Sequence, residues 1–93
     1  MIISFACKET ERIWSGKGSR KLPTAIQKVA RRKLRMLNNA ACLDDLRVPP
    51  SNRLELLKGD LKGLYSIRVN DQFRLCFVWH EGQALDVKIM DYH

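Results

Sequence analysis

Three segments near the C-terminal end of the chain alternate apolar with polar residues at a period of two. They cover residues 64–69, 73–79 and 84–93, and short turns rich in polar residues or glycine separate them. This alternation is typical of half-buried strands joined as hairpins. It predicts an antiparallel sheet whose buried face is formed by Tyr65, Ile67, Val69, Phe73, Leu75, Phe77, Trp79, Leu85, Val87 and Ile89.

Two arginines fall on the opposite face of this predicted sheet. If each turn has an odd number of residues, the apolar faces stay in register and Arg68 lies directly across from Arg74, one diagonal step from Tyr92. Like charges in this arrangement destabilise a hairpin by about 0.2–1 kcal/mol, so we expect an anion between them. Alternatively, both arginines point into water, or Asp60 or Glu55 neutralises them.

The strongest predicted helix covers residues 24–39, because Pro23 suits a first turn and nothing up to Asn39 breaks a helix. Lys33 falls at the edge of the apolar stripe, where its stem is expected to lie on the core while its amine reaches water. The apolar stripe consists of Ile26, Val29, Ala30, Leu34 and Leu37. The opposite side carries Lys28, Arg31, Arg32 and Arg35 without an acid at i±4, which predicts a phosphate-binding face, a solvated face being the alternative.

The remaining segments predict smaller elements. Residues 1–6 form a short first strand, residues 9–14 one or two helical turns, and residues 42–46 a helical turn before the extended connection at Pro49 and Pro50. Residues 53–57 form an edge strand, and residues 58–63 a flexible loop. The order predicts one α+β domain over residues 1–93, with an N-terminal strand and two helices packed on an antiparallel sheet of three to four strands.

Charge and cysteine content limit the environment and the partners. Seventeen Lys and Arg against ten Asp and Glu give a net charge of +7, which favours RNA, DNA or an acidic protein as partner. Three cysteines without a C-x-x-C pair predict free thiols in a reducing cytoplasm. Cys76 is expected to be an inert packed thiol, with a nucleophile as the less favoured alternative.

Several classes of protein are not expected from this sequence. No apolar run approaches the length of a membrane span. His80 and His93 are the only histidines and no acidic cluster has ligand spacing, so neither a metal nor another cofactor is expected.

Three stretches together resemble the HigB toxins of the RelE-like superfamily: residues 53–60, residues 65–75 and the terminal Asp91-Tyr92-His93. The resemblance implies a ribosome-dependent endoribonuclease that cleaves translated mRNA in the ribosomal A site. It also implies a helix-turn-helix (HigA-like) antitoxin as partner, with operator DNA contacted only through the antitoxin complex. The site residues that it implies are Lys58, Arg68, Arg74, Asp91, Tyr92 and His93. Where well-studied members have a histidine, this chain has Glu55.

Cleaving RNA without a metal needs a base near the ribose 2′-OH, an acid near the leaving oxygen, and cations around the phosphorane. Glu55 either takes the role of the base or only anchors Lys58 or Arg74. For the C-terminal residues, the alternatives are a frayed tail and a simple salt-bridge acid. Two other classes stay open: a non-catalytic basic RNA- or DNA-binding module, and a protein-interaction domain. Under the anion-site hypothesis, Arg74→Ala is expected to abolish cleavage without disturbing the fold, because it relieves repulsion.

Overall fold

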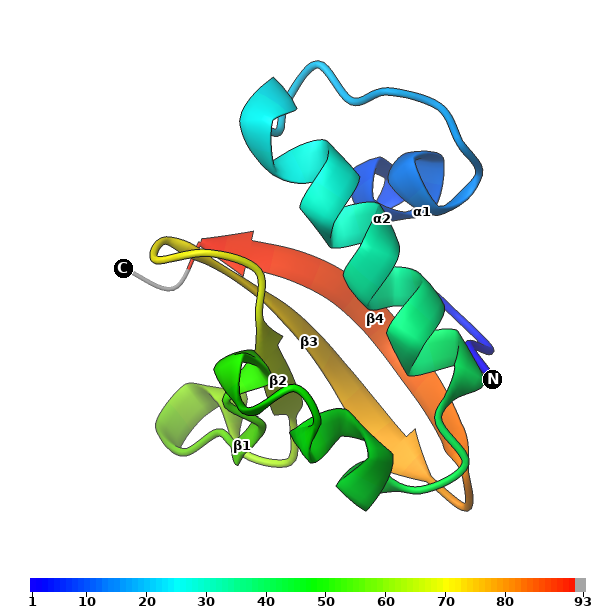
Figure 1. Cartoon of the computed structure of the whole chain (residues 1–93), viewed down its shortest axis with the longest axis vertical. Coiled ribbons are helices and arrows are strands. Elements are labelled where there is room, and N and C mark those ends of the chain that lie inside the picture. The colour runs from blue at the N-terminus through cyan, green and yellow to red at the C-terminus, as the bar shows by residue number, and fades with distance from the viewer. Residues whose placement is uncertain (92–93) are drawn as a thin grey trace.

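The computed structural model describes residues 1–91, so Tyr92 and His93 lie outside the described residues. Figure 1 shows two helices covering one face of a four-stranded sheet, which confirms the predicted α+β architecture. All neighbouring strands are antiparallel, in the order β1-β2-β3-β4. The elements are α1 (Lys8–Trp14), α2 (Thr24–Asn39), the 3-10 helices η1 (Leu43–Arg47) and η2 (Pro50–Asn52), β1 (Glu55–Leu56), the 3-10 helix η3 (Gly59–Leu61), β2 (Tyr65–Arg68), β3 (Phe73–His80) and β4 (Gln83–Asp91).

Both helices begin and end close to where the sequence predicts. Helix α1 ends at Trp14, and Gly16, two residues later, has a φ of 86°. The amides of Gly16 and Lys17 donate to the carbonyl oxygens of Ile13 and Arg12, a pattern that closes a helix through a left-handed glycine. Helix α2 covers residues 24–39, and most of its apolar stripe is fully buried against β3 and β4. Among residues 1–91, no helix is both long and apolar enough to cross a bilayer.

The predicted pairings of Arg68 with Arg74 and of Leu75 with Ile89 are confirmed, although the β3–β4 turn has two residues and not the odd number assumed. Ile67 pairs with Leu75, and Leu75 with Ile89, which places these side chains together under α2. The turn between β3 and β4 consists of Glu81 and Gly82, both with positive φ, as two-residue hairpin turns require. The face of the sheet turned away from the helices is called the outer face below.

The prediction that Leu85 lies in the core is wrong. Cys76 pairs with Lys88, but Val78, two residues further along β3, pairs with Leu85, three residues back along β4. The extra residue on β4 is a bulge, and Asp86 has a φ of 51° there. The bulge turns Leu85 toward the outer face, so that the fully buried Ala84 takes its place in the core.

The predicted first strand is replaced by two isolated parallel bridges. Ile2 pairs with Ala84, and Phe5 pairs with Val87. The amide of Ile3 donates to the carbonyl of Ala84 at 2.8 Å. The N-terminal segment therefore covers the outer edge of β4, the edge that a sheet otherwise leaves unpaired.

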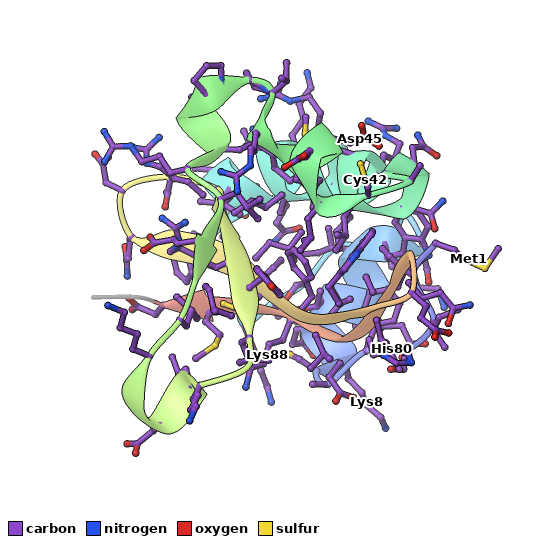
Figure 2. All side chains as sticks on the ribbon, turned by 90° about the horizontal axis from the view of Figure 1, so that it is seen from below. Met1, Lys8, Cys42, Asp45, His80 and Lys88 are labelled. Carbon is purple, nitrogen blue, oxygen red and sulfur yellow. The ribbon has the colours of Figure 1, made fainter. Side chains whose placement is uncertain are left out.

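The segment between α2 and β1 contains more helix than the sequence predicts. The predicted turn at 42–46 is confirmed as η1, and Figure 2 shows Cys42 and Asp45 together there. The carboxylate of Asp45 accepts hydrogen bonds from the amides of Ala41 and Cys42, and these bonds lower the pKa of Asp45. The extended connection holds at Pro49 but not at Pro50, which begins η2. Residues 59–61 form η3 within the predicted loop.

The position predicted for Lys33 is wrong in one respect. The side chain does lie on the core, but Lys33 is only 6% exposed and its amine does not reach water. The Lys33 amine donates to Oδ1 of Asn52, which is itself fully buried. The Asn52 amide in turn donates to the Leu46 carbonyl at 3.1 Å. This polar cluster connects α2 to η1 and η2.

Candidate functional site

Arg74 is the most constrained residue of the predicted site. Its Nε donates to Oγ of Ser66 at 2.7 Å, and its Nη2 donates to the carbonyl oxygen of Arg53 at 2.5 Å. Nη2 also forms an ion pair with Oε1 of Glu55 at 3.2 Å. Arg74 is only 7% exposed. The structure therefore places this guanidinium in a fixed, largely buried position on the outer face.

The register explains how Glu55 reaches Arg74. Glu55 on β1 pairs with Ser66 on β2, and Ser66 pairs with Cys76 on β3, so these side chains share the outer face. Arg74 lies on the same face of β3 and extends across β2 toward β1. Its side chain covers Ser66, which is fully buried although it lies on the face without helices.

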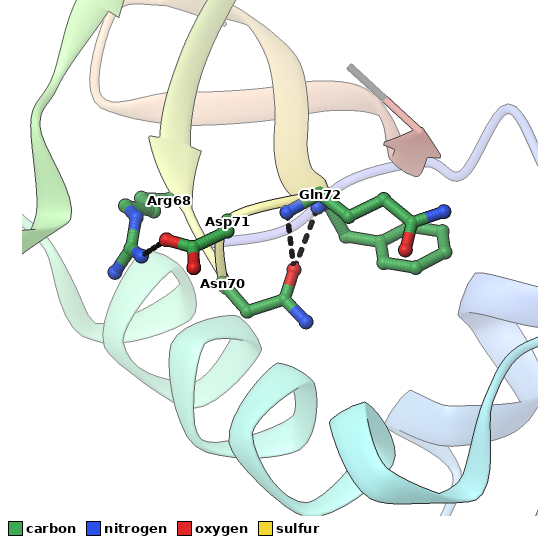
Figure 3. A network of polar contacts seen from close by, with 5 residues as sticks. Arg68, Asn70, Asp71 and Gln72 are labelled. Carbon is green, nitrogen blue, oxygen red and sulfur yellow. Dashed lines mark hydrogen bonds and ion pairs between the residues drawn. The ribbon is translucent and has the colours of Figure 1, made fainter. Parts of the chain in front are cut away.

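Arg68 lies directly opposite Arg74, as predicted, but it has an ion-pair partner of its own. Figure 3 shows the Arg68 guanidinium bonded to the carboxylate of Asp71 in the turn between β2 and β3. Asn70 fixes this turn, because its Oδ1 accepts the amide of Gln72 at 2.9 Å and that of Phe73 at 2.7 Å. Sequence reasoning does not identify Asp71 as a site residue. Its position three residues after Arg68, in a turn, is the signal that could have found it.

Of the alternatives for the arginine pair, neutralisation by Glu55 is observed for Arg74. Asp60, the other acid considered, lies in η3, and the acid beside Arg68 is Asp71 instead. Because Arg74 donates to buried groups, the structure argues against the expectation that Arg74→Ala leaves the fold undisturbed. Removal of the guanidinium leaves the Ser66 hydroxyl and the Arg53 carbonyl without this donor.

Asp91 is the last residue of β4. It pairs with Phe73 in the register, so strand alternation directs it to the side opposite Arg74 and Met90. Its Oδ2 accepts a hydrogen bond from Nε2 of Gln72 at 2.9 Å. Asp91 is thus connected to the β2–β3 turn.

The other predicted catalytic residues are not brought together with the arginine pair. Lys58 is exposed and lies beyond the end of β1, in the connection to η3. Arg68 lies at the opposite end of β2 from this connection. Tyr92 and His93 lie outside the described residues. Within the described range, the structure therefore brings together Glu55, Arg68 and Arg74.

The basic face of α2 is only partly as predicted. Lys28, Arg32 and Arg35 are exposed, whereas Arg31 is half-buried. Nε of Arg31 donates to the carbonyl oxygen of Ile13 at 2.9 Å. Arg31 therefore connects α2 to the end of α1, and three cations remain on the exposed face of the helix.

Burial changes the titration of two further residues. The pKa of Lys33 is lowered first by burial and then by the positive charges of Arg32 and Arg68. The pKa of Cys76 is raised to about 11 by burial, against the opposing effect of Arg74 and Lys88. The raised pKa disfavours the thiolate, as expected for an inert packed thiol.

Two surface hollows in residues 1–91 lie away from this face. The larger is about 440 Å³ and lies over α1, where it is lined by Lys8, Glu9, Glu11, Arg12, Ser15 and Lys17. The second, about 330 Å³, is lined by Glu9, Arg12, Arg20 and Lys21. None of the predicted catalytic residues lines either hollow. Within residues 1–91, no three His, Cys, Asp or Glu side chains form a group that could hold a metal ion.

Comparison with known proteins identifies relatives along nearly the whole chain. Residues 3–93 match the family described as the RelE-like toxin of type II toxin-antitoxin system HigB. Toxin HigB-1 of Vibrio cholerae serotype O1 is 45% identical over 87 residues, which are 92% of this chain and 92% of that one. An uncharacterized protein of Haemophilus influenzae is 42% identical over 64 residues, 69% of this chain and 63% of that one.

Solved structures show the same fold at low sequence identity. The structure of YafQ from E. coli strain BL21(DE3) superimposes with a TM-score of 0.59 at 14% identity, covering 99% of this chain and 92% of that one. The YoeB-YefM complex from Staphylococcus aureus contains a chain that superimposes with a TM-score of 0.61 at 19% identity, covering 100% of this chain and 95% of that one. Because the family match and the 45% identity both cover more than nine tenths of the sequence, the chain belongs to the HigB family of RelE-like toxins from type II toxin–antitoxin systems.

Proposed function

We propose that this toxin is a ribosome-dependent endoribonuclease that cleaves translated mRNA in the ribosomal A site. The observation that carries the proposal is the pairing of Arg68 with Arg74 on the outer face, with the Glu55 carboxylate beside Arg74. Cations fixed before the substrate arrives stabilise the charge that develops on a pentacoordinate phosphorus. This arrangement gives the toxin one candidate base and two cations for the reaction.

Each residue then has a role in the proposed reaction. Glu55 accepts the proton of the ribose 2′-OH; its side chain is 49% exposed, so substrate can reach it. Arg68 and Arg74 hold the phosphate, and Lys58 provides a further cation from the η3 connection. His93 or Tyr92 protonates the leaving 5′-oxygen.

The need for the ribosome is supported by where the aromatic residues lie. The six aromatic residues within 1–91 all pack in or against the core: Phe5, Trp14, Tyr65, Phe73, Phe77 and Trp79. Little of their surface is therefore left to grip single-stranded RNA by stacking, an interaction of about 1–3 kcal/mol per base. The ribosome would instead present the mRNA in a reactive geometry, a contribution that reaches about 7–11 kcal/mol in well-oriented systems.

The same proposal covers binding and partners. Lys28, Arg32 and Arg35, with Arg31 at the edge, contact phosphates of ribosomal RNA. A type II system includes an antitoxin, and we propose a helix-turn-helix, HigA-like one that also carries the complex to operator DNA. The toxin acts as a single domain of residues 1–93 in the cytoplasm, without a metal or other cofactor.

Cleavage on programmed ribosomes tests the proposal. Purified toxin is added to ribosomes stalled on a defined mRNA with an empty A site, and to the same mRNA alone, and the 5′ ends of the products are mapped. We expect cuts within the A-site codon only when ribosomes are present. Inhibition of translation without new 5′ ends would favour a basic binding module or a protein-interaction domain. Efficient multiple-turnover cutting of naked mRNA would indicate an ordinary ribonuclease.

A further inference from the structure

We propose that Arg68, Lys33 and Arg32 form a binding site for an RNA phosphate between α2 and the β2–β3 turn, and that Asp71 occupies this site until RNA displaces it. The inference deepens the proposed function and rests on it for the identity of the ligand as RNA. It adds two residues, Lys33 and Asp71, that neither the sequence pattern nor the family resemblance assigned. It also gives Arg68 and Arg74 different roles, because different residues surround them.

The two arginines of the pair differ in what surrounds them. Arg74 is buried and bonded to Ser66 and to the Arg53 carbonyl. The Arg68 side chain is about one third exposed, and its ion pair is with Asp71, an acid of the turn. Figure 3 shows the Arg68 guanidinium directly beside a turn of α2. Arg68 is thus the more exposed arginine of the pair, and the one that an incoming phosphate meets more easily.

Lys33 brings a second cation to this position from α2. Its amine donates to Asn52, and η2, which contains Asn52, packs against β2. An ammonium has three donors, and in residues 1–91 this one is bonded to a neutral amide and no carboxylate. A buried cation without a counter-ion is unfavourable unless another charge compensates it. A phosphate at Arg68 would provide that compensation.

The charges at this position do not balance in the free protein. The positive charges of Arg32 and Arg68 both act on Lys33 and, after burial, lower its pKa. The acid bonded to Arg68 is Asp71, whose side chain is 97% exposed. An exposed ion pair contributes only about 0–1 kcal/mol, whereas a planar guanidinium holds two phosphate oxygens at once. A phosphate therefore competes well with Asp71.

Loss of the bond between Asp71 and Arg68 should leave the β2–β3 turn and the sheet unchanged. Asn70 holds the amides of Gln72 and Phe73 through its own side chain, so the turn keeps its shape when the Asp71 carboxylate moves into solvent. Gln72 also donates to Asp91. The same turn therefore connects to Asp91 through the residue that follows Asp71.

Binding of an uncleavable RNA to the isolated full chain tests the inference. The probe is a fluorescein-labelled 2′-O-methyl pentaribonucleotide, measured by anisotropy at several salt concentrations. Asp71→Asn should tighten binding by about 1.4- to 5-fold, the range to which 0.2–1 kcal/mol corresponds. Asp44→Asn is the matched control, because Asp44 forms the same kind of exposed i,i+3 pair with Arg47 on η1. Both variants raise the net charge by one, so equal effects would overturn the inference.

A second pair of variants tests Lys33. Lys33→Gln keeps a donor for Asn52 but removes the charge, and should weaken binding by at least threefold; exposed Lys62→Gln in the loop after η3 is its control. In the wild type, the Nε–Hε resonance of Arg68 should shift on titration with the pentanucleotide, and it should start from a different position in Asp71→Asn. An unshifted Arg68 resonance, or equal binding by the two lysine variants, would overturn the inference.

These measurements are independent of cleavage. A selective effect of Asp71→Asn in the absence of A-site cutting would support the phosphate site and contradict the proposed function. A-site cutting with no difference between Asp71→Asn and Asp44→Asn would support the proposed function and contradict the phosphate site.

Discussion

Glu55 and Arg74 form an ion pair at 3.2 Å although β2 lies between the strands that carry them. The two partners differ in exposure: the Glu55 side chain is 49% exposed and that of Arg74 only 9%. A substrate on the outer face therefore meets the carboxylate first and the guanidinium behind it. In the proposed reaction this order suits a base at the surface with a fixed cation beneath it.

Arg74→Ala should destabilise the protein as well as abolish cleavage. We expect the free energy of unfolding to fall by about 2–4 kcal/mol, because the charged hydrogen bonds to buried groups disappear and their partners are left unsatisfied. Urea denaturation measures the change. Arg68→Ala is the control: its exposed pair with Asp71 should contribute less than about 1 kcal/mol. Equal midpoints for the two variants would show that Arg74 is not a structural anchor.

Glu55→Gln tests whether the carboxylate is the general base. The amide keeps the shape and an acceptor for Arg74, but it removes the negative charge beside a largely buried guanidinium, so the variant should be less stable and its folded fraction is measured alongside cleavage. Single-turnover cleavage on programmed ribosomes should fall by about 10²–10⁴-fold, the usual contribution of a general base. Glu55→His should restore or exceed the wild-type rate. A rate for Glu55→Gln equal to that of the wild type would reduce Glu55 to an anchor of Arg74.

Arg31 should behave differently from the exposed cations of α2. Changing Lys28, Arg32 and Arg35 together to Gln should reduce the salt dependence of ribosome binding, by about 0.7–0.9 in log–log slope for each RNA phosphate that the protein no longer neutralises. Arg31→Gln should instead lower the free energy of unfolding by about 1 kcal/mol, because its bond to the Ile13 carbonyl is removed. If Arg31→Gln changes only the salt slope, its bond to α1 has no structural role.

The stability of the protein should rise with pH in a way that depends on Lys33. Burial lowers the pKa of Lys33 below its ordinary value of 10.5, so the unfolded chain holds this proton more tightly than the folded one. The free energy of unfolding therefore gains from Lys33 as pH rises through the lowered pKa up to about 10.5. Lys33→Gln should lack this gain. The free energy of unfolding of both proteins is measured in urea from pH 7 to 10.5. Subtracting one from the other removes the contribution of other titrating groups such as Cys76. A difference in unfolding free energy that stays constant over this pH range would contradict the prediction.

The cysteines should differ in reactivity toward iodoacetamide. Cys42 is exposed and should be alkylated rapidly at pH 8. Cys76 is fully buried and its pKa is raised to about 11, so it should react only in protein unfolded by urea. Mass spectrometry of proteolytic peptides after timed quenching distinguishes the two. Alkylation of Cys76 at the rate of Cys42 in native protein would show that β3 opens locally.

Local patterns explain most of what the sequence predicts correctly. The bounds of α2 follow from Pro23 and from an unbroken 3.6-residue period, and the pairing of Arg68 with Arg74 follows from strand alternation and the length of one turn. Both depend on residues close together in the chain. The bulge at Asp86 does not, because it results from fitting β4 to β3 and to the N-terminal segment at once, and it reverses the side on which Leu85 lies.

The sequence predicts which residues form the candidate site better than it predicts what surrounds them. Alternation alone places Arg74 on the outer face, but its burial depends on the carbonyl of Arg53, which η2 brings from a different segment. Lys33 is similar: the helical period places it at the edge of the apolar stripe, and only the fold brings the buried Asn52 to its amine. A partner supplied by another segment has no local sequence signal.

The parallel pairing of the N-terminal segment with β4 has a consequence for synthesis of the chain. Ser4 accepts a hydrogen bond from the amide of Asp86, 82 residues later. The N-terminal segment therefore cannot complete its pairing until β4 is present. Contacts this distant in sequence form late, and a domain folds as a unit once its segments are all available. A nascent chain that ends before β4 lacks Val87 and Ile89 from the core and cannot complete the sheet. The toxin therefore gains its folded outer face only after β4 has been translated.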